Sequence, residues 1–477
     1  MSTINTNVPA VVAQRHLAQS QRRLGVSLER LSSGLKINRG SDDPAGLIVS
    51  ERLRAEIAAV RQSIDNTSRA INVISTTEGA LNEVAALLID IKGLTVEAAN
   101  AGAFSDEEVE ANQLQIDSAI ESITRIANTS TFAGQKLLNG QLDYVTSGVS
   151  TSDLADVDVL SAKFGSAKTV AVNIDVSLSA QTAQLGYGSL PGQIPLPSAV
   201  SISLEGPTGI IPLTFPANAD QAAIITAVNS VTADTGVSAV ASGAAVTMNS
   251  TEYGTKAYVS VDPLPGSAGF EVIDRNGATV KRTTGRDAEA TINGISCVGD
   301  GLKLSVSSVS LKLKVMLDPS FGASQTNFVV TGGGALFQLG PDVNTNQQEN
   351  IGVKSMHANK LGNRIVGFLS QLKSGQLCSL RSENFSQASK ILNEAQTQVS
   401  TLRGRLGAFE RNTLQTNIGQ LQITTENLTA SESVIRDTDF AAETSELTRS
   451  QILVQAGNSI LAVANAQSQN VLTLLGG

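Results

Sequence analysis

Apolar residues recur at three- and four-residue spacing in the first part of the chain. Leu17, Leu24 and Leu31 lie seven residues apart, and Leu28 and Leu35 follow two of them by four. A longer stretch repeats the pattern in two registers, one of Leu53, Val60, Thr67, Ile74, Leu81 and Leu88 and one of Ile57, Ile64, Ile71 and Ala85. Such spacing predicts helices whose narrow apolar seams need partner helices.

The same spacing returns near the C-terminus. One seam is expected from Ala388, Ala395, Leu402, Phe409, Thr416 and Ile423, flanked by Ile391, Leu406 and Thr413. A last seam is expected from Leu453, Ile460, Gln467 and Leu474, flanked by Ala456, Val463 and Val471. These positions predict a long helix followed by a shorter one.

Residues from about 141 to 350 follow a different pattern. Alternation replaces the helical period, as in "LKLSVSSVSLKLKVML" from Leu302, and Gly, Pro, Ser and Thr become common. This composition predicts strands and turns, with one helix in "DQAAIITAVNSVTADTG" from Asp220. The fold class predicted is therefore a multidomain α + β protein.

The order of the seams predicts how the ends meet. At the start of the chain a short apolar seam is followed by a break and then by a long seam. At the end of the chain the order is reversed, with a long seam, a break and a short seam. Because a narrow seam cannot bury itself, the short helices should pair with each other and the long ones likewise, with the β-rich segment as a projecting insertion. We expect residues 1–43 and 435–477 to form a coiled-coil domain, 44–140 and 351–434 a long-helix bundle, and 141–350 the outer domain or domains.

The first break carries helix-ending and helix-starting residues. Gly34 tolerates the left-handed conformation that ends many helices, and Gly40 follows in the turn. Asp43 can accept hydrogen bonds from the free N–H groups of the next helix, and Pro44 suits its first position. Asp42 and Asp43 are better explained by this capping than by acid–base catalysis.

Charge and composition exclude several classes of protein. The formal net charge of −9 argues against general nucleic-acid binding, which needs a basic face. The most apolar stretch, from Gln451, is interrupted by amide side chains, so no membrane insertion is expected, and no cleavable signal peptide is apparent. Cys297 and Cys378 cannot form a disulfide framework and are expected to be unpaired thiols.

Catalytic chemistry is sparse along the chain. The only histidines are His16 and His357, and no zinc-protease, C-x-x-C or P-loop motif is present. We therefore expect no enzyme activity, no cofactor and no metal site.

The two ends differ in charge. Residues 1–40 contain six basic side chains and the single acidic Glu29, whereas residues 450–477 contain no charged side chain. A final helix with one apolar and one Gln/Asn/Ser face indicates packing in a crowded, polar but uncharged environment.

Both ends resemble the bacterial flagellin family, over roughly residues 1–140 and 350–477. The matching stretches are "LERLSSGLKINRGSDDPAGLIVSERLRAEI" and "NTSRAINVISTTEGALNEV" at the start, and "RLGAFERNTLQTNIGQLQITTENLTASESVIRDTDFAAETSELTRSQILVQAGNSILAVANAQSQNVLTLL" at the end. "GRDAEATINGISC", from Gly285, is similar to a motif of some flagellins and related axial proteins.

The resemblance implies a secreted subunit of the extracellular flagellum that self-assembles into a helical filament for motility. It implies export as an unfolded chain through the flagellar type III apparatus, an export chaperone at the C-terminal segment, and contact with cap and hook–filament junction proteins. The expected polymerisation core comprises Leu17, Leu24, Leu28, Leu31 and Leu35 with Leu453, Ala456, Ile460, Val463, Val471 and Leu474.

One stretch departs from the family pattern. Many flagellins carry a basic patch that vertebrate innate-immune receptors recognise, and here Ile89, Asp90, Lys92, Gly93 and Leu94 occupy the equivalent positions. Asp90 replaces the first arginine of the patch, and Gly93 replaces its acidic residue. The resemblance therefore implies weak receptor activation.

Three alternatives stay open at the level of the sequence. A hook–filament junction protein would share the terminal architecture at low copy number. A flagellin bearing a zinc protease is disfavoured because residues 141–350 contain no histidine. The insertion could also bind glycans or surfaces, or carry O-linked glycans on its Ser/Thr-rich face.

Overall fold

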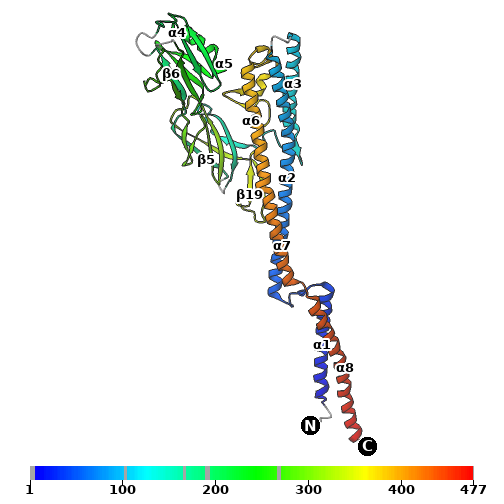
Figure 1. The fold of residues 1–477 in the computed structure, drawn as a ribbon. Coiled ribbons are helices and arrows are strands. Elements are labelled where there is room, and N and C mark those ends of the chain that lie inside the picture. The colour runs from blue at the N-terminus through cyan, green and yellow to red at the C-terminus, as the bar shows by residue number, and fades with distance from the viewer. Residues whose placement is uncertain (1–5, 101–104, 165–167, 189–193, 266–269, 476–477) are drawn as a thin grey trace. The chain divides into compact units, whose positions relative to one another are not determined.

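The computed structural model describes residues 6–100, 105–164, 168–188, 194–265 and 270–475, with side chains described as far as residue 467. Helices occupy both ends of the chain and strands occupy the middle (Figure 1), which confirms the predicted α + β class. The chain forms two compact units, one of residues 1–68, 339–343 and 414–477 and one of residues 69–338 and 344–413. The boundaries of the five expected domains stay a prediction.

The N-terminal helices are α1 (Val8–Ser33), α2 (Pro44–Ala98) and α3 (Asp106–Thr129). Along α2 the first predicted register is buried at Val60, Thr67, Ile74, Leu81 and Leu88, whereas its first member, Leu53, is half-buried. The second predicted register is wrong beyond Ile57, because Ile64, Ile71 and Ala85 are only half-buried. Its place is taken by Ser63, Ala70, Thr77, Val84, Ile91 and Ala98, which are all buried.

Hydroxyl side chains can occupy this seam because α2 satisfies them itself. Thr67 donates to the carbonyl of Ser63 at 2.7 Å, and Thr77 donates to the carbonyl of Val73 at 2.7 Å. A buried hydroxyl that bonds the carbonyl four residues earlier leaves no unpaired group in the seam. Ser63 and Thr77, the polar members of the register that the pattern missed, can therefore be buried without an unpaired hydroxyl.

The C-terminal helices are α6 (Phe385–Phe409), a π-helical turn (Glu410–Gln415), α7 (Thr416–Arg436) and α8 (Phe440–Leu475). The predicted seam is buried from Ala388 to Leu406 but is wrong from Phe409 onward. Leu414 and Leu421 are buried instead, whereas Ile423 is 57% exposed. A π turn holds one more residue than an α turn, so every later position shifts by one.

Two segments expected to be helical are irregular. α3 ends at Thr129, and the following hairpin joins β1 (Thr131–Phe132) to β2 (Gln135–Lys136). Residues 352–384 hold only the short hairpin of β20 (Gly362–Asn363) and β21 (Gly367–Phe368) and two 3₁₀ turns, Leu369–Leu372 and Leu380–Ser382. Gly362, Gly367 and Gly375 have positive φ there, which explains why the helical pattern does not resume until Phe385.

The strands build two lobes, each around its own hydrophobic core. The first lobe contains β3 (Tyr144–Ser147), β4 (Leu154–Ala162), β5 (Val170–Leu178), β13 (Glu289–Ile292), β14 (Ile295–Val298), β15 (Lys303–Ser307), β16 (Leu311–Leu317) and β17 (Gln325–Gly333). Its sheets have the antiparallel orders β14-β13-β5-β17-β3 and β15-β16-β4. A separate hairpin pairs β18 (Ala335–Gln338) with β19 (Gln348–Ile351).

The second lobe is an insertion between β5 and β13. It contains β6 (Thr182–Tyr187), β7 (Val200–Glu205), β8 (Ile210–Phe215), β9 (Val237–Ser242), β10 (Ala245–Tyr253), β11 (Tyr258–Pro263) and β12 (Arg282–Thr284). The helix expected after Asp220 is α4 (Gln221–Ser230), capped by that aspartate, and α5 (Thr232–Thr235) follows. The β-rich zone therefore has two cores, a point on which the sequence was silent.

Candidate functional site: the terminal helix pair

The two breaks in the helical ends lie side by side. The segment between α1 and α2 forms a backbone bridge with the segment between α7 and α8, at Leu35 and Asp437. The N–H of Lys36 donates to the carbonyl of Arg436 at 2.7 Å, and the N–H of Thr438 donates to the carbonyl of Gly34 at 3.0 Å. The mirrored order of seams and breaks in the sequence thus corresponds to a direct contact.

The residues at the first break act largely as expected. Gly34 ends α1 with a φ of 73°. Pro44 is the first residue of α2, and the Asp43 carboxylate accepts from the N–H of Gly46 at 2.9 Å. These positions confirm the capping interpretation of the stretch.

Asp42 stabilises the turn rather than the helix. Its carboxylate accepts from the N–H groups of Arg39 at 2.8 Å and Asn38 at 3.0 Å, and these bonds hold the pKa of Asp42 below its ordinary 3.8. Gly40 does not have the positive φ of Gly34, and a Cβ there would meet only Leu47 at 3.6 Å. Glycine is therefore not required at position 40.

The sequence interpretation missed Gly46 and Ile37. A Cβ on Gly46 would stand 2.5 Å from an Asp43 carboxylate oxygen and 2.7 Å from Cδ1 of Ile37, which is itself buried. The turn folds back over the start of α2 and leaves no room for a side chain. Nothing in the local pattern signals this, because Gly46 lies inside a helix.

Ion pairs join the two ends of the chain around these breaks. Arg30 of α1 lies 3.5 Å from Glu443 of α8, and Arg436 lies 3.0 Å from Glu51. Glu443 and Glu446 line a groove with Arg22, Arg23 and Arg30. The basic N-terminal segment therefore meets acidic groups at the start of α8, before the uncharged tail begins.

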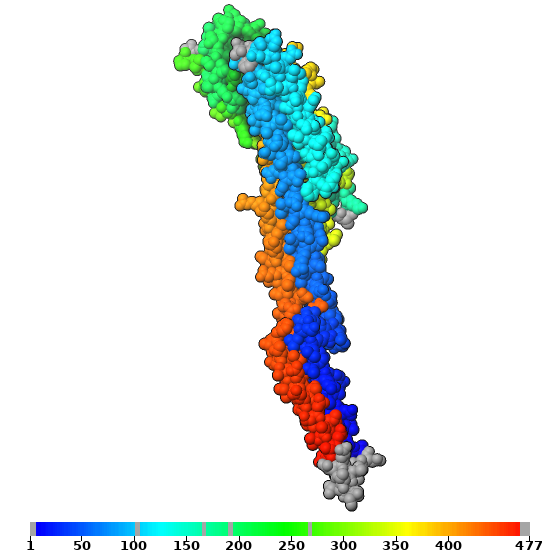
Figure 2. Space-filling view, turned by 90° about the vertical axis from the view of Figure 1, so that its right-hand side faces the viewer, coloured from blue at the N-terminus to red at the C-terminus, as the bar shows by residue number. Residues whose placement is uncertain are grey.

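α1 and α8 lie side by side over their length (Figures 1 and 2). Leu17 is buried in this pair, and a Cβ on Gly457 would stand 3.2 Å from its Cδ1 atom. The Asn7 side chain donates to the carbonyl of Ala464 at 2.9 Å. Small residues on α8 thus allow a close approach of the two helices.

The expected polymerisation-core leucines of α1 divide into two groups. Leu17 is buried against α8, whereas Leu24, Leu31 and Leu35 are half-buried and Leu28 is 51% exposed. The α1–α8 contact therefore covers only part of the predicted seam.

Within one chain, the seam expected on α8 does not close against α1. Leu453, Ile460 and Val463 are 40%, 59% and 67% exposed, and Ala456 is also exposed. The contact face contains Gly457 and Ala464 instead, because small residues permit the short interhelical distance. The side chains of Val471 and Leu474 lie outside the described residues, and the role of all six in polymerisation stays a prediction.

Large apolar side chains remain exposed over the whole terminal unit. Those on its helices are Val8, Val11, Val12, Val26, Leu28, Ile48, Val49, Ile423, Val434, Phe440, Ile452, Leu453, Ile460 and Val463. Their number on four helices exceeds the scattered apolar residues of an ordinary monomer surface and marks an interaction surface.

The stretch equivalent to the receptor patch lies on α2 in the other unit. Ile89 is 56% exposed, and Asp90 and Gly93 are also exposed. Lys92 donates to the Asn393 side chain at 2.7 Å, and Leu94 is half-buried. The altered residues thus face solvent, and their effect on receptors stays a prediction.

We next consider metal-binding groups, cysteines and membrane-spanning helices among the described residues. They contain no group of three or more His, Cys, Asp or Glu side chains placed to hold a metal ion. Cys297 and Cys378 are both buried and free of disulfides. No helix in the described ranges has both the length and the apolarity that crossing a membrane requires.

The chain is similar to known proteins along its full length. Residues 4–143 match the bacterial flagellin N-terminal helical region, and residues 389–475 match the bacterial flagellin C-terminal helical region. It is 30% identical to a flagellin of Salmonella rubislaw across 99% of both chains, and 29% identical to polar flagellin F of Vibrio parahaemolyticus, again across 99% of both. A flagellin of Clostridium tyrobutyricum is 29% identical, with 98% of this chain and 100% of the relative covered. The chain therefore belongs to the bacterial flagellin family and is a structural component of the flagellar filament.

Proposed function

We propose that this chain self-assembles into the helical filament through the apolar faces that α1 and α8 leave exposed. The observation that supports this most directly is the exposure of Leu453, Ile460 and Val463 on α8, beside the line of Gly457 and Ala464 that contacts α1. Leu453 and Ile460 lie four residues before Gly457 and Ala464, so they border the contact with α1, yet a single chain leaves them uncovered.

Burial of these uncovered side chains supplies the driving force. Fully burying a Leu, Ile or Val side chain contributes about 1.5–3 kcal/mol, so a few such residues per contact can hold subunits together in a multivalent lattice. The same face repeated on every copy, without a closing rotation, builds a filament rather than a ring. We place the contact between subunits on α1 and α8 because these two helices carry most of the exposed apolar residues of their unit.

We further propose how the chain reaches the filament. The chain is exported unfolded through the flagellar type III apparatus to the extracellular flagellum, and an export chaperone covers the α8 face beforehand. Cap and hook–filament junction proteins are its other partners. The outer lobes carry Ser- and Thr-rich surface that can accept O-linked glycans.

Electron microscopy of purified protein tests the assembly surface. The triple variant Leu453→Ser, Ile460→Ser, Val463→Ser should stay monomeric under salting-out conditions in which the natural chain forms long filaments. A version lacking residues 1–40 and 450–477 should also stay monomeric.

A matched control separates assembly from general solubility. Val145, Val309 and Leu377 are 59%, 89% and 78% exposed in the other unit, and their triple serine variant should polymerise normally. Filaments from the α8 variant, with unchanged yield and length, would contradict the proposal. Far-UV circular dichroism of both variants checks that helix content is retained.

A further inference from the structure

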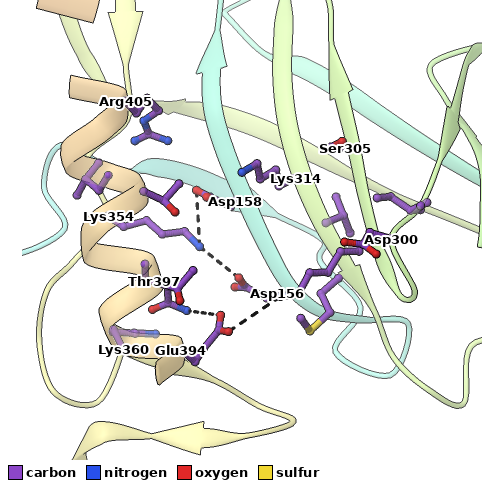
Figure 3. A pocket seen from close by; sticks show the side chains of 18 of the residues that line it. Asp156, Asp158, Asp300, Ser305, Lys314, Lys354, Lys360, Glu394, Thr397 and Arg405 are labelled. Atoms are coloured by element: carbon purple, nitrogen blue, oxygen red, sulfur yellow. Dashed lines mark hydrogen bonds and ion pairs between the residues drawn. The ribbon is translucent and has the colours of Figure 1, made fainter. Parts of the chain in front are cut away.

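A cavity of about 360 Å³ lies between α6 and the outer face of the β15-β16-β4 sheet, within one unit of the molecule (Figure 3). The segment around Lys354 closes a third side. Neither the terminal helix pair nor the exposed apolar faces contribute to it. Its volume is near the lower end of the range for small-molecule sites.

The sheet wall of the cavity consists of two cross-strand rows. One row is Lys303, Met316 and Asp156, and the next is Ser305, Lys314 and Asp158. Alternate residues of the same strands, such as Leu304 and Val315, point into the hydrophobic core of the lobe. Strand alternation therefore gathers the polar residues on the cavity side.

The helix wall is one face of α6. It presents Glu394, Thr397, Gln398, Thr401 and Arg405, whose three- and four-residue spacing places them on the same side of the helix. Figure 3 shows Arg405 and Lys314 at one end of the cavity and Glu394 and Lys360 at the other. Among the residues that the structure describes, no aromatic side chain lines the space, so a ligand held by ring stacking is disfavoured.

Most of the carboxylates in the cavity are already paired. Lys354 lies 3.3 Å from Asp156 and 3.6 Å from Asp158. At the rim, Asp300 pairs with Lys256 at 2.8 Å and Glu394 with Lys303 at 4.0 Å.

Three cationic side chains of the cavity can still form ion pairs or hydrogen bonds with a ligand. Lys314 lies directly opposite Asp158 in the sheet, yet neither it nor Lys360 has an ion-pair partner within the described residues. Arg405 donates to the carbonyl of Gly352, but its Nε atom is buried with no acceptor among the residues described. Burial holds the pKa of Arg405 below its ordinary value, although the charges of Asp158 and Asp143 oppose the shift.

We propose that this cavity binds a small polyhydroxylated carboxylate of the sugar-acid class. Lys314 and Arg405 bind the carboxylate, since charge-assisted bonds to an oxyanion are the strongest contacts available there. The hydroxyls of Ser305 and Thr401, which make no hydrogen bond within the described chain, and the carboxylates of Asp156 and Glu394 bind the ligand hydroxyl groups. The site is independent of polymerisation.

Isothermal titration calorimetry of the full-length unpolymerised chain tests the site, with D-glucuronate as the probe. We expect a Kd of about 1 mM, with D-glucose, which lacks the carboxylate, weaker by about tenfold or more. Lys314→Met removes the ammonium group and retains most of the side chain, and it should weaken glucuronate binding by about tenfold.

The neighbouring lysine provides the matched control. Lys312 is the next outward-facing residue of β16, paired with Ser307 and Ser161, and it does not line the cavity. Lys312→Met should leave binding unchanged. No glucuronate binding at about 20 mM, or equal loss in both lysine variants, would overturn the proposal. Inorganic phosphate binding as tightly as glucuronate would reduce the site to a simple anion site and refute the sugar-acid class.

Discussion

Leu17 of α1 packs directly against Gly457 of α8 in the terminal helix pair. A Cβ atom at position 457 would stand 3.2 Å from Cδ1 and 3.7 Å from Cα of Leu17. The first distance is shorter than most carbon–carbon contacts in a packed interior, so the two helices are as close here as glycine allows.

Gly457→Val should therefore separate α1 from α8. Overpacking of this kind costs about 1–3 kcal/mol, and the β-branched side chain cannot turn away from Leu17. We expect faster amide hydrogen exchange in residues 8–33 of the monomer, measured by mass spectrometry. Gly419→Val is the control, since nothing lies within 4 Å of a Cβ at that helical glycine of α7. Equal exchange rates in the two variants would show that the contact is unimportant.

The shifted register after the π turn predicts a clear contrast between two apolar residues. Leu414 is fully buried, so Leu414→Ala should cost about 2–5 kcal/mol. Ile423, which the heptad pattern places in the seam, is 57% exposed, and Ile423→Ala should cost about 0.5 kcal/mol or less. Thermal unfolding followed by far-UV circular dichroism compares them. A larger loss of stability in Ile423→Ala than in Leu414→Ala would instead support the unshifted heptad register.

Asp143 makes the stability of the β-rich region depend on pH in a defined direction. Burial raises the pKa of this carboxyl above its ordinary 3.8, although the Tyr144 N–H bond and the Lys354 charge oppose the shift. The folded state therefore binds the proton more tightly than the unfolded state. Its stabilising effect is present at low pH and is lost as pH rises through the raised pKa.

Asp143→Asn should accordingly be more stable than the natural chain at neutral pH, and the difference should shrink as pH falls toward 3.8. Urea unfolding followed by tyrosine fluorescence reports this region, because all four tyrosines, the first of which is Tyr144, lie between residues 141 and 350. Asp153→Asn is the opposite case, since the Thr326 hydroxyl lowers the pKa of Asp153. A destabilised Asp143→Asn variant at neutral pH would show that its hydrogen bonding outweighs its burial.

The uncharged tail leads to a prediction about filament growth. We propose that the Gln/Asn/Ser face of residues 450–477 lines the channel through which new subunits travel, so that it offers no charge to bind them. Introducing lysine at Asn458 and Asn465, both exposed on α8, should slow elongation in growing cells. Glutamine at both positions is the uncharged control. Normal filament length in the lysine variant would exclude this role.

The altered patch on α2 leads to a prediction about immune recognition. We propose that this chain activates vertebrate flagellin receptors weakly, because Asp90 reverses a charge of the patch on an exposed surface. Asp90→Arg should raise the response in a receptor reporter cell line, and Asp106→Arg, on the neighbouring helix α3, should not. A strong response to the unmodified chain would refute the proposal.

Several features of the molecule follow from the sequence alone. The end of α1 at Gly34, the start of α2 at Pro44, the helix α4 after Asp220 and the register from Val60 to Leu88 all agree with the structure. These features are local, because they depend on φ preferences, capping side chains and a periodicity that a few neighbouring residues define.

Other features were decided by tertiary structure. The sequence pattern placed Ile64 and Ile71 in the seam, but Ser63, Ala70 and Thr77 are the buried residues, and α2 itself accepts the hydrogen bonds of the Ser63 and Thr77 hydroxyls. The π turn at Glu410–Gln415 shifts the seam to Leu414, and the structure places Gly457 and Ala464 of α8 against α1 in place of Leu453 and Ile460. The periodicity of one helix identifies its apolar positions. The distance between two packed helices, and the face that each one buries, depend on the partner helix. That is why the tight contacts at Gly457 and Gly46 could be recognised only in the folded chain.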